Sequence, residues 1–563
     1  MKEKKTMTID NTLVEFTDEK NVLECCRKAG IELPTFCYQP ELSVFGSCRM
    51  CMVELEGRGI VPACSTKPDA NMIIRTNTRP IRAMRKTIIE LMLAAHDKNC
   101  TVCPKSTDCR LQSIARSLGV EDSRFKKMPK AGDLDLSSDA IVRDPQRCVL
   151  CGNCVRVCNE TQSVGALNFT YRGAKAQAGT CFNKGLGAVE CVGCGQCTKV
   201  CPVGALTPKY QIEKVWNALG DKTKTCVVQI APAVRVALGE YFGIEPGKVV
   251  IGQIVTALRR MGFAKVYDTC YGADLTVMEE SAEFLERKKK GERLPMFTSC
   301  CNAWINFTEQ FFPELLNNLS TCKSPQQMVG SVVKEKLPQE LKIARENLVM
   351  VSVMPCTAKK IEANRQEFKV HGNPDVDCVI TTKELALMIK ECGIDFKNLP
   401  AGTFDMPYGE FTGAGVIFGA SGGVSEAVLR AAADLLDHGK PHEFKQFRNA
   451  DGIKVSEIAI GKQTLRLAVV SGLANARKVL EQIKNKTANY DLVEIMACPG
   501  GCVNGGGQPI GGLQTAVKSR AKGLYDNDKK MKTHISTQNK ALPKLDHAHA
   551  HELLHTKYNN RKG

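Results

Sequence analysis

Polar and hydrophobic residues alternate along MTIDNTLVEF, residues 7–16, and this period of two predicts a pair of short β-strands with one buried face. In NVLECCRKAGI, residues 21–31, the apolar positions instead recur at the spacing of an amphipathic helix. Two strands followed by such a helix outline a β-grasp domain. Cys25 and Cys26 fall on the helix, and we interpret them as packing residues because small thiols are often buried.

From about Thr225 onward, short apolar runs alternate with helical patterns. Strands are predicted within residues 225–234, 347–355, 466–472 and 490–498, and helices within residues 250–263 and 382–393. This alternation predicts parallel α/β layers, which carry their chemistry at the strand ends. Five cysteines stand at such positions: Cys300 and Cys301 in FTSCCNAW, Cys356 in VMPCTAKKIE, and Cys498 and Cys502 in EIMACPGGCVNGGGQP.

The length of 563 residues exceeds the size at which one hydrophobic core keeps growing, so several domains are expected. A hydrophobic content of 43% with 24% charged residues is ordinary for a globular protein, and no window of about eighteen uncharged apolar residues would span a bilayer. The N-terminus has neither an apolar secretory segment nor a twin-arginine pair, which predicts a cytoplasmic protein. In that reducing compartment, 28 cysteines indicate metal binding rather than disulfides.

The clearest cysteine spacing is CVLCGNCVRVC, repeated as CVGCGQCTKVCP; both read C-x2-C-x2-C-x3-C. In the bacterial ferredoxin pattern, three cysteines hold one 4Fe–4S cluster and the fourth reaches the other cluster. A pair of zinc sites is the alternative, although tetrahedral zinc usually takes separated C-x2-C pairs. The expected ligands are Cys148, Cys151, Cys154 and Cys201 for the first cluster, and Cys158, Cys191, Cys194 and Cys197 for the second.

Two further ligand sets precede this repeat. CYQPELSVFGSCRMCMVELEGRGIVPAC has a first gap of ten residues instead of the four of the plant-type 2Fe–2S loop, so it predicts a variant of that site. HDKNCTVCPKSTDC offers one imidazole and three thiolates, and neutral imidazole in place of a thiolate should raise a cluster's potential. His96 stands four positions before Cys100, which puts both on one face of a helix; a Cys3His zinc site has the same spacing. The sets are Cys37, Cys48, Cys51 and Cys64, then His96, Cys100, Cys103 and Cys109.

Four cofactor sites in the first 210 residues leave little room for a substrate pocket and predict a conductor of single electrons. Together with FTSCCNAW, VMPCTAKKIE and EIMACPGGCVNGGGQP, they make the chain resemble an iron-only (FeFe) hydrogenase of the long form with four accessory clusters, over nearly its whole length. The resemblance implies an α+β multidomain fold. Its expected parts are a β-grasp 2Fe–2S domain (1–80), a small His/Cys3 4Fe–4S domain (81–125), a ferredoxin-like domain with two 4Fe–4S clusters (126–210), an α/β H-cluster domain with two lobes (211–514), and a small-subunit-like segment (515–563).

The resemblance also implies the active site. In this family a 4Fe–4S cluster is joined through one cysteine to a di-iron subsite with CO, CN⁻ and azadithiolate ligands, and together they form the H-cluster. The implied ligands are Cys301, Cys356, Cys498 and Cys502, with Cys502 as the bridge. Cys300 is left as a proton-transferring thiol, and adjacent side chains of an extended segment do face opposite sides. A thiol pKa of about 8.5 also suits proton transfer near neutral pH better than a hydroxyl does.

A proton path from this thiol is implied through Glu280, Ser320 and Glu283, with Arg287 near the exit. Glu280 and Glu283 have the spacing of one helix face, which without the resemblance would be an ordinary solvated face. Lys359 is implied as a hydrogen-bond donor to a cyanide, and residues 505–507 are expected to permit close backbone approach rather than to bind phosphate. Further contacts with the cluster are implied for Ala231, Pro232, Gln326, Met354 and Met496.

Two features depart from the family pattern. Asn302 replaces the usual proline, which restores an N–H and adds an amide near the relay thiol, so we hypothesise altered gating of Cys300 or an altered oxygen response. The C-terminal HAHAHELLHTKY resembles the family's closing segment, but the stretch before it is shortened. Its histidines could form a metal tract, although at a chain end we interpret them as solvent-facing: His547, His549, His551 and His555.

Six cysteines without a role are interpreted as packing residues: Cys181, Cys226, Cys270, Cys322, Cys378 and Cys392.

The net charge of +17 raises the question of a partner. The basic runs at 123–130 and 286–293 come with no base-reading motif, so nucleic acid is not expected, and steering of an acidic electron carrier such as ferredoxin is preferred. H2 and protons are the implied substrates, and dedicated maturases are needed to install the H-cluster. No nucleotide-binding fingerprint occurs, so a role in an NAD(P)H-linked or electron-bifurcating assembly would need diaphorase subunits.

Two non-catalytic roles are also open, those of an H2 sensor and of an iron–sulfur assembly protein. A sensor is expected to lose the relay thiol at Cys300, and assembly relatives are expected to lack the full N-terminal ligand array. Both features are present here, which favours an enzyme.

Overall fold

The computed structural model describes residues 4–128, 132–437, 444–448, 452–460, 463–510 and 513–561, and the chain forms two compact units. The first unit contains residues 1–161, 165–189 and 197–207; the second contains residues 162–164, 190–196 and 208–563. Within the described ranges no helix has the length and apolar character to cross a membrane.

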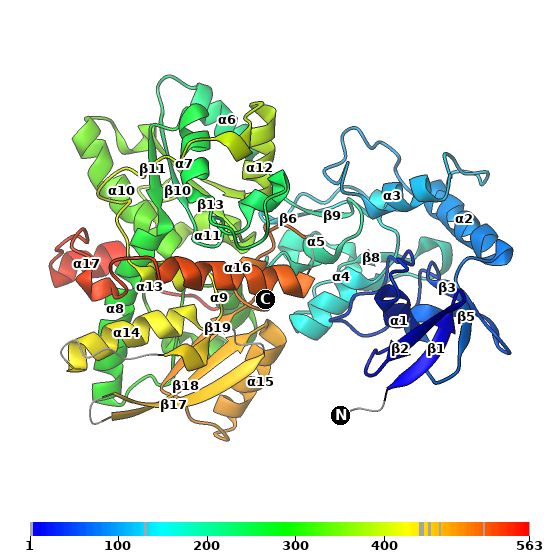
Figure 1. The fold of residues 1–563 in the computed structure, drawn as a ribbon. Helices are drawn as coiled ribbons and strands as arrows, with labels where there is room; N and C mark the ends of the chain where they lie inside the picture. The colour runs from blue at the N-terminus through cyan, green and yellow to red at the C-terminus, as the bar shows by residue number, and fades with distance from the viewer. Residues whose placement is uncertain are drawn as a thin grey trace. The chain divides into compact units, whose positions relative to one another are not determined.

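The first unit begins with a mixed five-stranded sheet in the order β2-β1-β5-β3-β4 (Figure 1). The predicted alternation at residues 7–16 forms the antiparallel pair β1 and β2, and β1 runs parallel to β5. Cys25 and Cys26 lie on α1 and are fully buried in the core beneath the sheet, which confirms that they pack. The elements are β1 (Lys5–Ile9), β2 (Thr12–Phe16), α1 (Val22–Lys28), β3 (Met52–Leu55), β4 (Gly59–Pro62) and β5 (Ile73–Arg75).

The rest of the first unit consists of short elements linked by loops that carry the cysteine motifs. Two small two-stranded sheets, β6-β9 and β7-β8, support these loops. The elements are α2 (Arg79–Ala94), α3 (Arg110–Ser117), β6 (Ile141–Arg143), α4 (Asn153–Arg156), β7 (Asn168–Thr170), β8 (Gln177–Gly179), α5 (Gln196–Val200) and β9 (Leu206–Pro208).

The second unit contains two four-stranded sheets. The first has the order β11-β10-β13-β16 and is parallel throughout, as the buried apolar runs predict. The second has the order β12-β19-β18-β17, in which only the β17-β18 pair is antiparallel. The strands are β10 (Thr225–Ile230), β11 (Lys265–Asp268), β12 (Met296–Phe297), β13 (Leu348–Met354), β16 (Cys378–Thr381), β17 (Ile453–Ile460), β18 (Gln463–Ser471) and β19 (Leu492–Met496).

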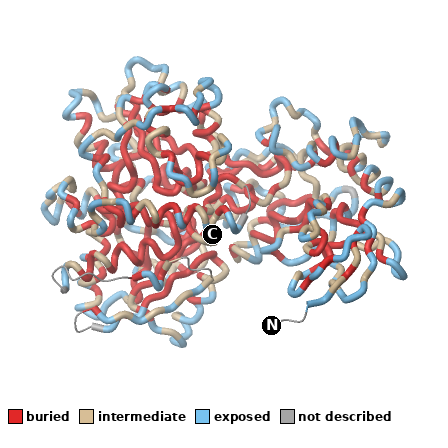
Figure 2. The backbone as a smooth tube through the Cα atoms, in the orientation of Figure 1, coloured by how far each residue is buried: buried red, intermediate tan, exposed pale blue. Residues whose placement is uncertain are grey.

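Helices cover these sheets, and most of their strands are buried (Figure 2). The long helix α8 packs against α10, α13 and α14 and is buried along much of its length. The helices are α6 (Ile212–Gly220), α7 (Ile251–Arg260), α8 (Thr269–Lys290), α9 (Asn302–Phe311), α10 (Pro325–Leu341), α11 (Ala358–Ala363), α12 (Thr382–Glu391), α13 (Gly413–Ile417), α14 (Gly423–Asp437), α15 (Leu473–Lys484), α16 (Leu513–Asp528) and α17 (His547–Leu554).

Candidate cluster and active sites

Four cysteines of the second unit come together just past the carboxyl ends of parallel strands. Cys301 follows β12, Cys356 follows β13 and Cys498 follows β19, while Cys502 begins the short 3-10 helix after β19. Each strand is held in register by a parallel neighbour, so each cysteine is delivered to an edge where open α/β sheets place ligands.

The sulfur atoms of this group lie close enough to influence each other's protonation. Burial raises the pKa of Cys502 well above its ordinary value, and the neighbouring Cys301, Cys356 and Cys498 raise it further. Burial and Cys301 raise the pKa of Cys356 to about 11. Four interior thiolates would therefore repel each other unless a cation neutralised them, so the donor set fits a polynuclear iron cluster.

Cys300 lies beside this group but faces different partners. It is buried, and burial followed by the Glu280 carboxyl raises its pKa well above the ordinary value. Cys301 has an extended backbone and precedes α9, which is consistent with neighbouring side chains that point apart. Glu280 is fully buried on α8, and its Oε1 accepts a hydrogen bond from the Ser299 N–H at 3.4 Å.

The carboxyl of Glu280 is the most unusual acid of this site. Burial raises its pKa from 4.5 to about 8, the neighbouring Glu283 adds to the rise, and a hydrogen bond with Ser320 opposes it. Ser320 Oγ donates to Glu283 Oε2 at 2.9 Å. The structure therefore places Cys300, Glu280, Ser320 and Glu283 near one another, and we call this row of proton-bearing side chains the proton file.

Arg287 holds the outer acid of this file in place. It forms an ion pair with Glu283 and donates to the Leu319 carbonyl at 2.8 Å. Only 2% of the surface of Arg287 is exposed, so it anchors Glu283 from inside the protein; its expected position near the exit of the path stays a prediction.

Lys359 follows Cys356 and points back toward the paired cysteines. Its Nζ donates to the Cys300 carbonyl at 3.0 Å and to Glu362 at 2.8 Å, and Glu362 raises the pKa of Lys359 against the effect of burial. Gln326 donates to the same carboxylate at 2.9 Å. Lys359 is thus a buried cation with a fixed direction, as an anionic ligand would require. The other residues implied as cluster contacts are buried in the second unit: Ala231, Pro232, Met354 and Met496.

Asn302 is the first residue of α9, a position where proline is well tolerated because its missing N–H has no partner within the helix. Its Nδ2 donates to the Ala358 carbonyl at 2.9 Å. The amide therefore links the start of α9 to the residue that precedes Lys359, a contact that proline could not make.

Glycines 505–507 lie against neighbouring backbone. A Cβ on Gly505 would stand 2.2 Å from the Pro355 carbonyl oxygen, and one on Gly506 would stand 2.8 Å from the Cys194 carbonyl oxygen. Close backbone approach is confirmed as the reason for glycine here. Thr357 Oγ1 also donates to the Gly193 carbonyl at 2.7 Å, so the Cys191–Cys194 segment is fastened to the loop that follows Cys356.

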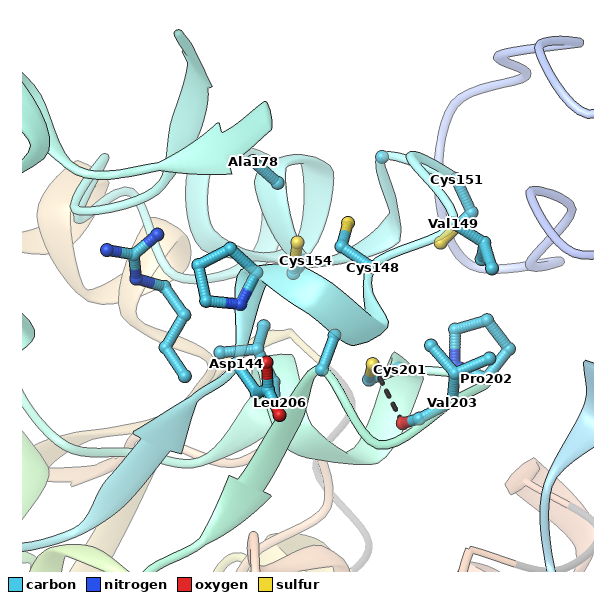
Figure 3. A pocket seen from close by; sticks show the side chains of 14 residues that line it. Asp144, Cys148, Val149, Cys151, Cys154, Ala178, Cys201, Pro202, Val203 and Leu206 are labelled. Carbon is cyan, nitrogen blue, oxygen red and sulfur yellow. Dashed lines mark hydrogen bonds between the residues drawn. The ribbon is translucent and has the colours of Figure 1, made fainter. Parts of the chain in front are cut away.

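One cavity of the first unit is lined by Cys148, Cys151, Cys154 and Cys201 (Figure 3). The last of these comes from the second copy of the repeat, as the ferredoxin pattern predicts. Burial raises the pKa of Cys151, and Cys201 and Cys148 raise it further. For the other set, Cys158 and Cys197 lie in the first unit and Cys191 and Cys194 in the second, so this ligand set stays a prediction.

The sulfur atoms of Cys37, Cys48, Cys51 and Cys64 form a second group in the first unit. All four are buried, and Cys37 and Cys48 lie 3.4 Å apart. Cys64 contacts both Cys37 and Cys51, which lowers the pKa of Cys51 to about 7. Arg156 donates to the Cys37 carbonyl and to Asn153, next to Cys154, so this group and the cavity share a support.

The histidine of the remaining set is buried, but the helical argument for it is wrong. Helix α2 ends at Ala94, so His96 and Cys100 lie in the following loop and not on one helix face. Cys103 and Cys100 both raise the pKa of Cys109 beyond the effect of burial, which places the three thiols near each other. Gly204 allows close approach here, because a Cβ would stand 2.6 Å from Cys103 Sγ.

Three other interpretations change. Cys181 and Cys392 are exposed, so they are not packing residues, whereas Cys226, Cys270, Cys322 and Cys378 are buried. The histidine side chain of His555 is only 10% exposed and contacts Glu279, so it is not solvent-facing as expected. Its position within 4.8 Å of Glu283 could not be found from the sequence, because it depends on how the last residues fold back.

Models of four known families match the chain. They are the iron only hydrogenase large subunit, C-terminal domain (residues 224–506), a 2Fe-2S iron-sulfur cluster binding domain (2–79), the NADH-ubiquinone oxidoreductase-G iron-sulfur binding region (85–124) and a 4Fe-4S dicluster domain (147–205).

Relatives match over almost the full length. The chain is 42% identical to the NADP-reducing hydrogenase subunit HndD of Solidesulfovibrio fructosivorans, over 99% of both chains. It is 37% identical to iron hydrogenase 1 of Clostridium pasteurianum, over 98% of this chain and 100% of the relative. Among solved structures, a variant of apo [FeFe]-hydrogenase HydA1 from Chlamydomonas reinhardtii matches with a TM-score of 0.57 and 39% identity, over 63% of this chain and 100% of that one.

Proposed function

Because the chain belongs to the iron-only (FeFe) hydrogenase family, we propose that it catalyses the reversible interconversion of H2 with two protons and two electrons. The observation that carries this proposal is the placement of a buried proton file, Cys300 to Glu283, beside four converging cysteines in the second unit. A buried acid whose pKa is raised to about 8, placed beside a thiol, is typical of a site that exchanges protons.

We assign Cys301, Cys356, Cys498 and Cys502 as ligands of the 4Fe–4S part of an H-cluster, with Cys502 as the bridge to the di-iron subsite. When bound, this cofactor supplies the redox-active iron at which H2 reacts. Lys359 would stabilise an anionic cyanide ligand, since Glu362 and the Cys300 carbonyl fix its direction. Ala231, Pro232, Gln326, Met354 and Met496 complete the surroundings of the cofactor.

Protons would be carried by the side chains of the second unit. Cys300 exchanges a proton with Glu280, and the Ser320 hydroxyl relays it between Glu280 and Glu283. A carboxyl with a pKa of about 8 is well matched to this role near neutral pH, because it can both hold and release a proton.

The accessory clusters would carry the electrons, and we assign one 2Fe–2S and three 4Fe–4S clusters. Their ligands are Cys37, Cys48, Cys51 and Cys64; His96, Cys100, Cys103 and Cys109; Cys148, Cys151, Cys154 and Cys201; and Cys158, Cys191, Cys194 and Cys197. Thiolate groups in loops with this spacing favour iron–sulfur clusters. We keep the domain boundaries at residues 80, 125, 210 and 514, with a β-grasp fold for the first domain.

Infrared spectroscopy of the matured protein tests the proposal. We expect CO and CN⁻ stretching bands that shift on exposure to H2, together with H2 evolution from a reduced carrier. Protein that has a full complement of iron and has been exposed to the H-cluster maturases, but shows no such bands, would overturn it.

A second function deepens the first: the chain would be the catalytic subunit of an NADP(H)-linked assembly. Its identity of 42% with the NADP-reducing hydrogenase subunit HndD, and the match of residues 85–124 to an NADH-ubiquinone oxidoreductase-G region, favour it. Purification of the native complex tests this, since a diaphorase partner with flavin is expected. Isolation of a single chain that accepts electrons from ferredoxin alone, at a rate that falls steeply with salt, would support the stand-alone enzyme instead.

A further inference from the structure

The end of the chain folds back onto the loop that carries Ser320. The Thr556 N–H donates to the Thr321 carbonyl at 2.7 Å, and the Lys323 N–H donates to the Leu554 carbonyl at 2.8 Å. An antiparallel bridge between Cys322 and His555 lies between these two bonds. Backbone atoms therefore fix the position of His555, whatever its side chain is.

The imidazole of His555 lies near two acids of α8, Glu279 and Glu283. Its Nδ1 lies 2.8 Å from Thr321 Oγ1, and its Nε2 lies 3.2 Å from Glu279 Oε2. One imidazole nitrogen, a Glu283 oxygen and the Cys322 sulfur all lie within 4.8 Å of one another. One water molecule can bridge such a separation between the imidazole and Glu283.

Of the three groups, Glu279 is the most exposed. The Glu283 side chain is 12% exposed and paired with Arg287, whereas the Glu279 side chain is 30% exposed. His555 lies between them at 10% exposed. A proton that leaves Glu283 thus meets His555 before it meets the solvated acid.

We propose that His555 and Glu279 form the outer proton-exchange site of this protein, a role that rests on the hydrogenase function proposed above. During H2 production, Glu279 takes a proton from water and passes it to one imidazole nitrogen. The ring is then an imidazolium, and its other nitrogen releases a proton toward Glu283. Water then takes the remaining proton from the first nitrogen and returns one to the other, which restores the first tautomer. The step moves one proton inward, needs no redox partner and runs in reverse when H2 is oxidised.

The groups that face His555 define what a pH experiment would report. They are Glu279 and Glu283 on α8, Cys322 in the facing loop, and His551, whose ring stacks on His555 at 5.0 Å. Burial raises the pKa of Cys322 well above the ordinary value. His551 is exposed and serves as the matched control.

Two substitutions distinguish proton transfer from support. His555→Gln can keep hydrogen bonds to Thr321 and Glu279 but cannot shuttle a proton, and His555→Ala leaves space for added imidazole. In the matured holoenzyme, we expect both variants to evolve H2 roughly threefold to tenfold more slowly; the loss is modest because water can replace an outer relay group in part. The loss should be largest at alkaline pH. Imidazole should restore the alanine variant, and His551→Ala should behave as the unmodified protein.

A second readout does not depend on turnover. After transfer into D2O, infrared spectroscopy follows hydrogen–deuterium exchange of the buried carboxyl of Glu280, and this exchange should be slower in both His555 variants. A wild-type pH profile with wild-type exchange in His555→Gln would overturn the proposal. Failure of the hydrogenase function itself would look different, because the matured unmodified protein would then show neither CO and CN⁻ bands nor H2 evolution.

Discussion

The candidate cofactor sites of the two units are built in different ways. In the first unit the cysteines that share a cavity come mostly from one stretch of eleven residues, CVLCGNCVRVC, and are held by loops. In the second unit, Cys301, Cys356 and Cys498 come from three separate strands, and the neighbouring Glu280 and Lys359 come from helices. The first design brings sulfurs together. The second also places a buried acid, Glu280, and a largely buried cation, Lys359, beside them.

We interpret this difference as a division between electron transfer in the first unit and proton transfer in the second. A cluster that only passes electrons needs thiolates and a tuned environment, which short loops supply. A site that must also deliver protons needs groups of matched pKa at fixed distances, and rigid strands and helices hold these more accurately than loops do.

The largest expected effect is on the paired cysteines. Cys300→Ser should lower H2 turnover by roughly 100-fold or more, because serine releases a proton far less readily. Iron content and the infrared bands of the matured protein should persist. Cys301→Ala is the matched change and should lose iron from the active site. Equal iron loss in both variants would show that Cys300 is a ligand, and the comparison between the two units would fail.

A change at Glu280 should follow in size. Glu280→Gln can still accept the Ser299 N–H but cannot exchange a proton, so turnover should fall roughly 100-fold, as for other general acids. Assays of H2 evolution against pH provide the measurement. Retention of most activity would show that protons reach Cys300 by another route.

The raised pKa of Glu280 also predicts a stability effect. Because the folded-state pKa of about 8 exceeds the ordinary 4.5, the proton on Glu280 favours the folded state below pH 4.5, and this contribution is lost as the pH rises through about 8. The midpoint temperature of unfolding of Glu280→Gln should therefore decline less over that range. Identical declines for the variant and the original protein would contradict the assigned pKa.

A smaller effect on turnover is expected in the first unit. Cys201→Ala should remove one 4Fe–4S cluster, measured as a loss of four irons and of one set of paramagnetic resonance signals. The active-site infrared bands should be unchanged. Cys181→Ala, at an exposed cysteine outside the cavity, is the control and should keep all its iron.

The smallest effect is expected for Asn302→Pro. Proline fits the first position of α9, so the fold should persist, with a loss of about 1 kcal/mol from the missing bond to Ala358. The pH profile of H2 evolution or the oxygen sensitivity should shift, because that bond connects α9 to the residue before Lys359. An unchanged profile together with unchanged oxygen sensitivity would contradict our hypothesis.

The sequence alone predicted most of the parallel strands and the grouping of Cys201 with Cys148, Cys151 and Cys154. Buried apolar runs such as residues 225–234 and 347–355 became β10 and β13, and the repeat spacing predicted that Cys201 joins the first three cysteines. Local periodicity does not contain tertiary contacts. It therefore predicted a helix that continues through His96, whereas α2 ends at Ala94. It also predicted a solvent-facing His555, whose side chain is only 10% exposed. Strand β17, which pairs antiparallel with β18, was also not predicted, because only the completed sheet decides which strand lies beside it.

The wide spacing of the active-site cysteines has a consequence for biosynthesis. Of the four cysteines that would hold the catalytic iron, Cys498 and Cys502 leave the ribosome last, after most of the polypeptide has been made. Thiols near the amino end can capture metal while translation continues. Loading of the catalytic iron would have to wait until the sheet that contains β19 has formed, so a ribosome stalled shortly before Cys498 would carry a nascent chain whose amino-terminal cysteine sets are complete but whose catalytic set is not.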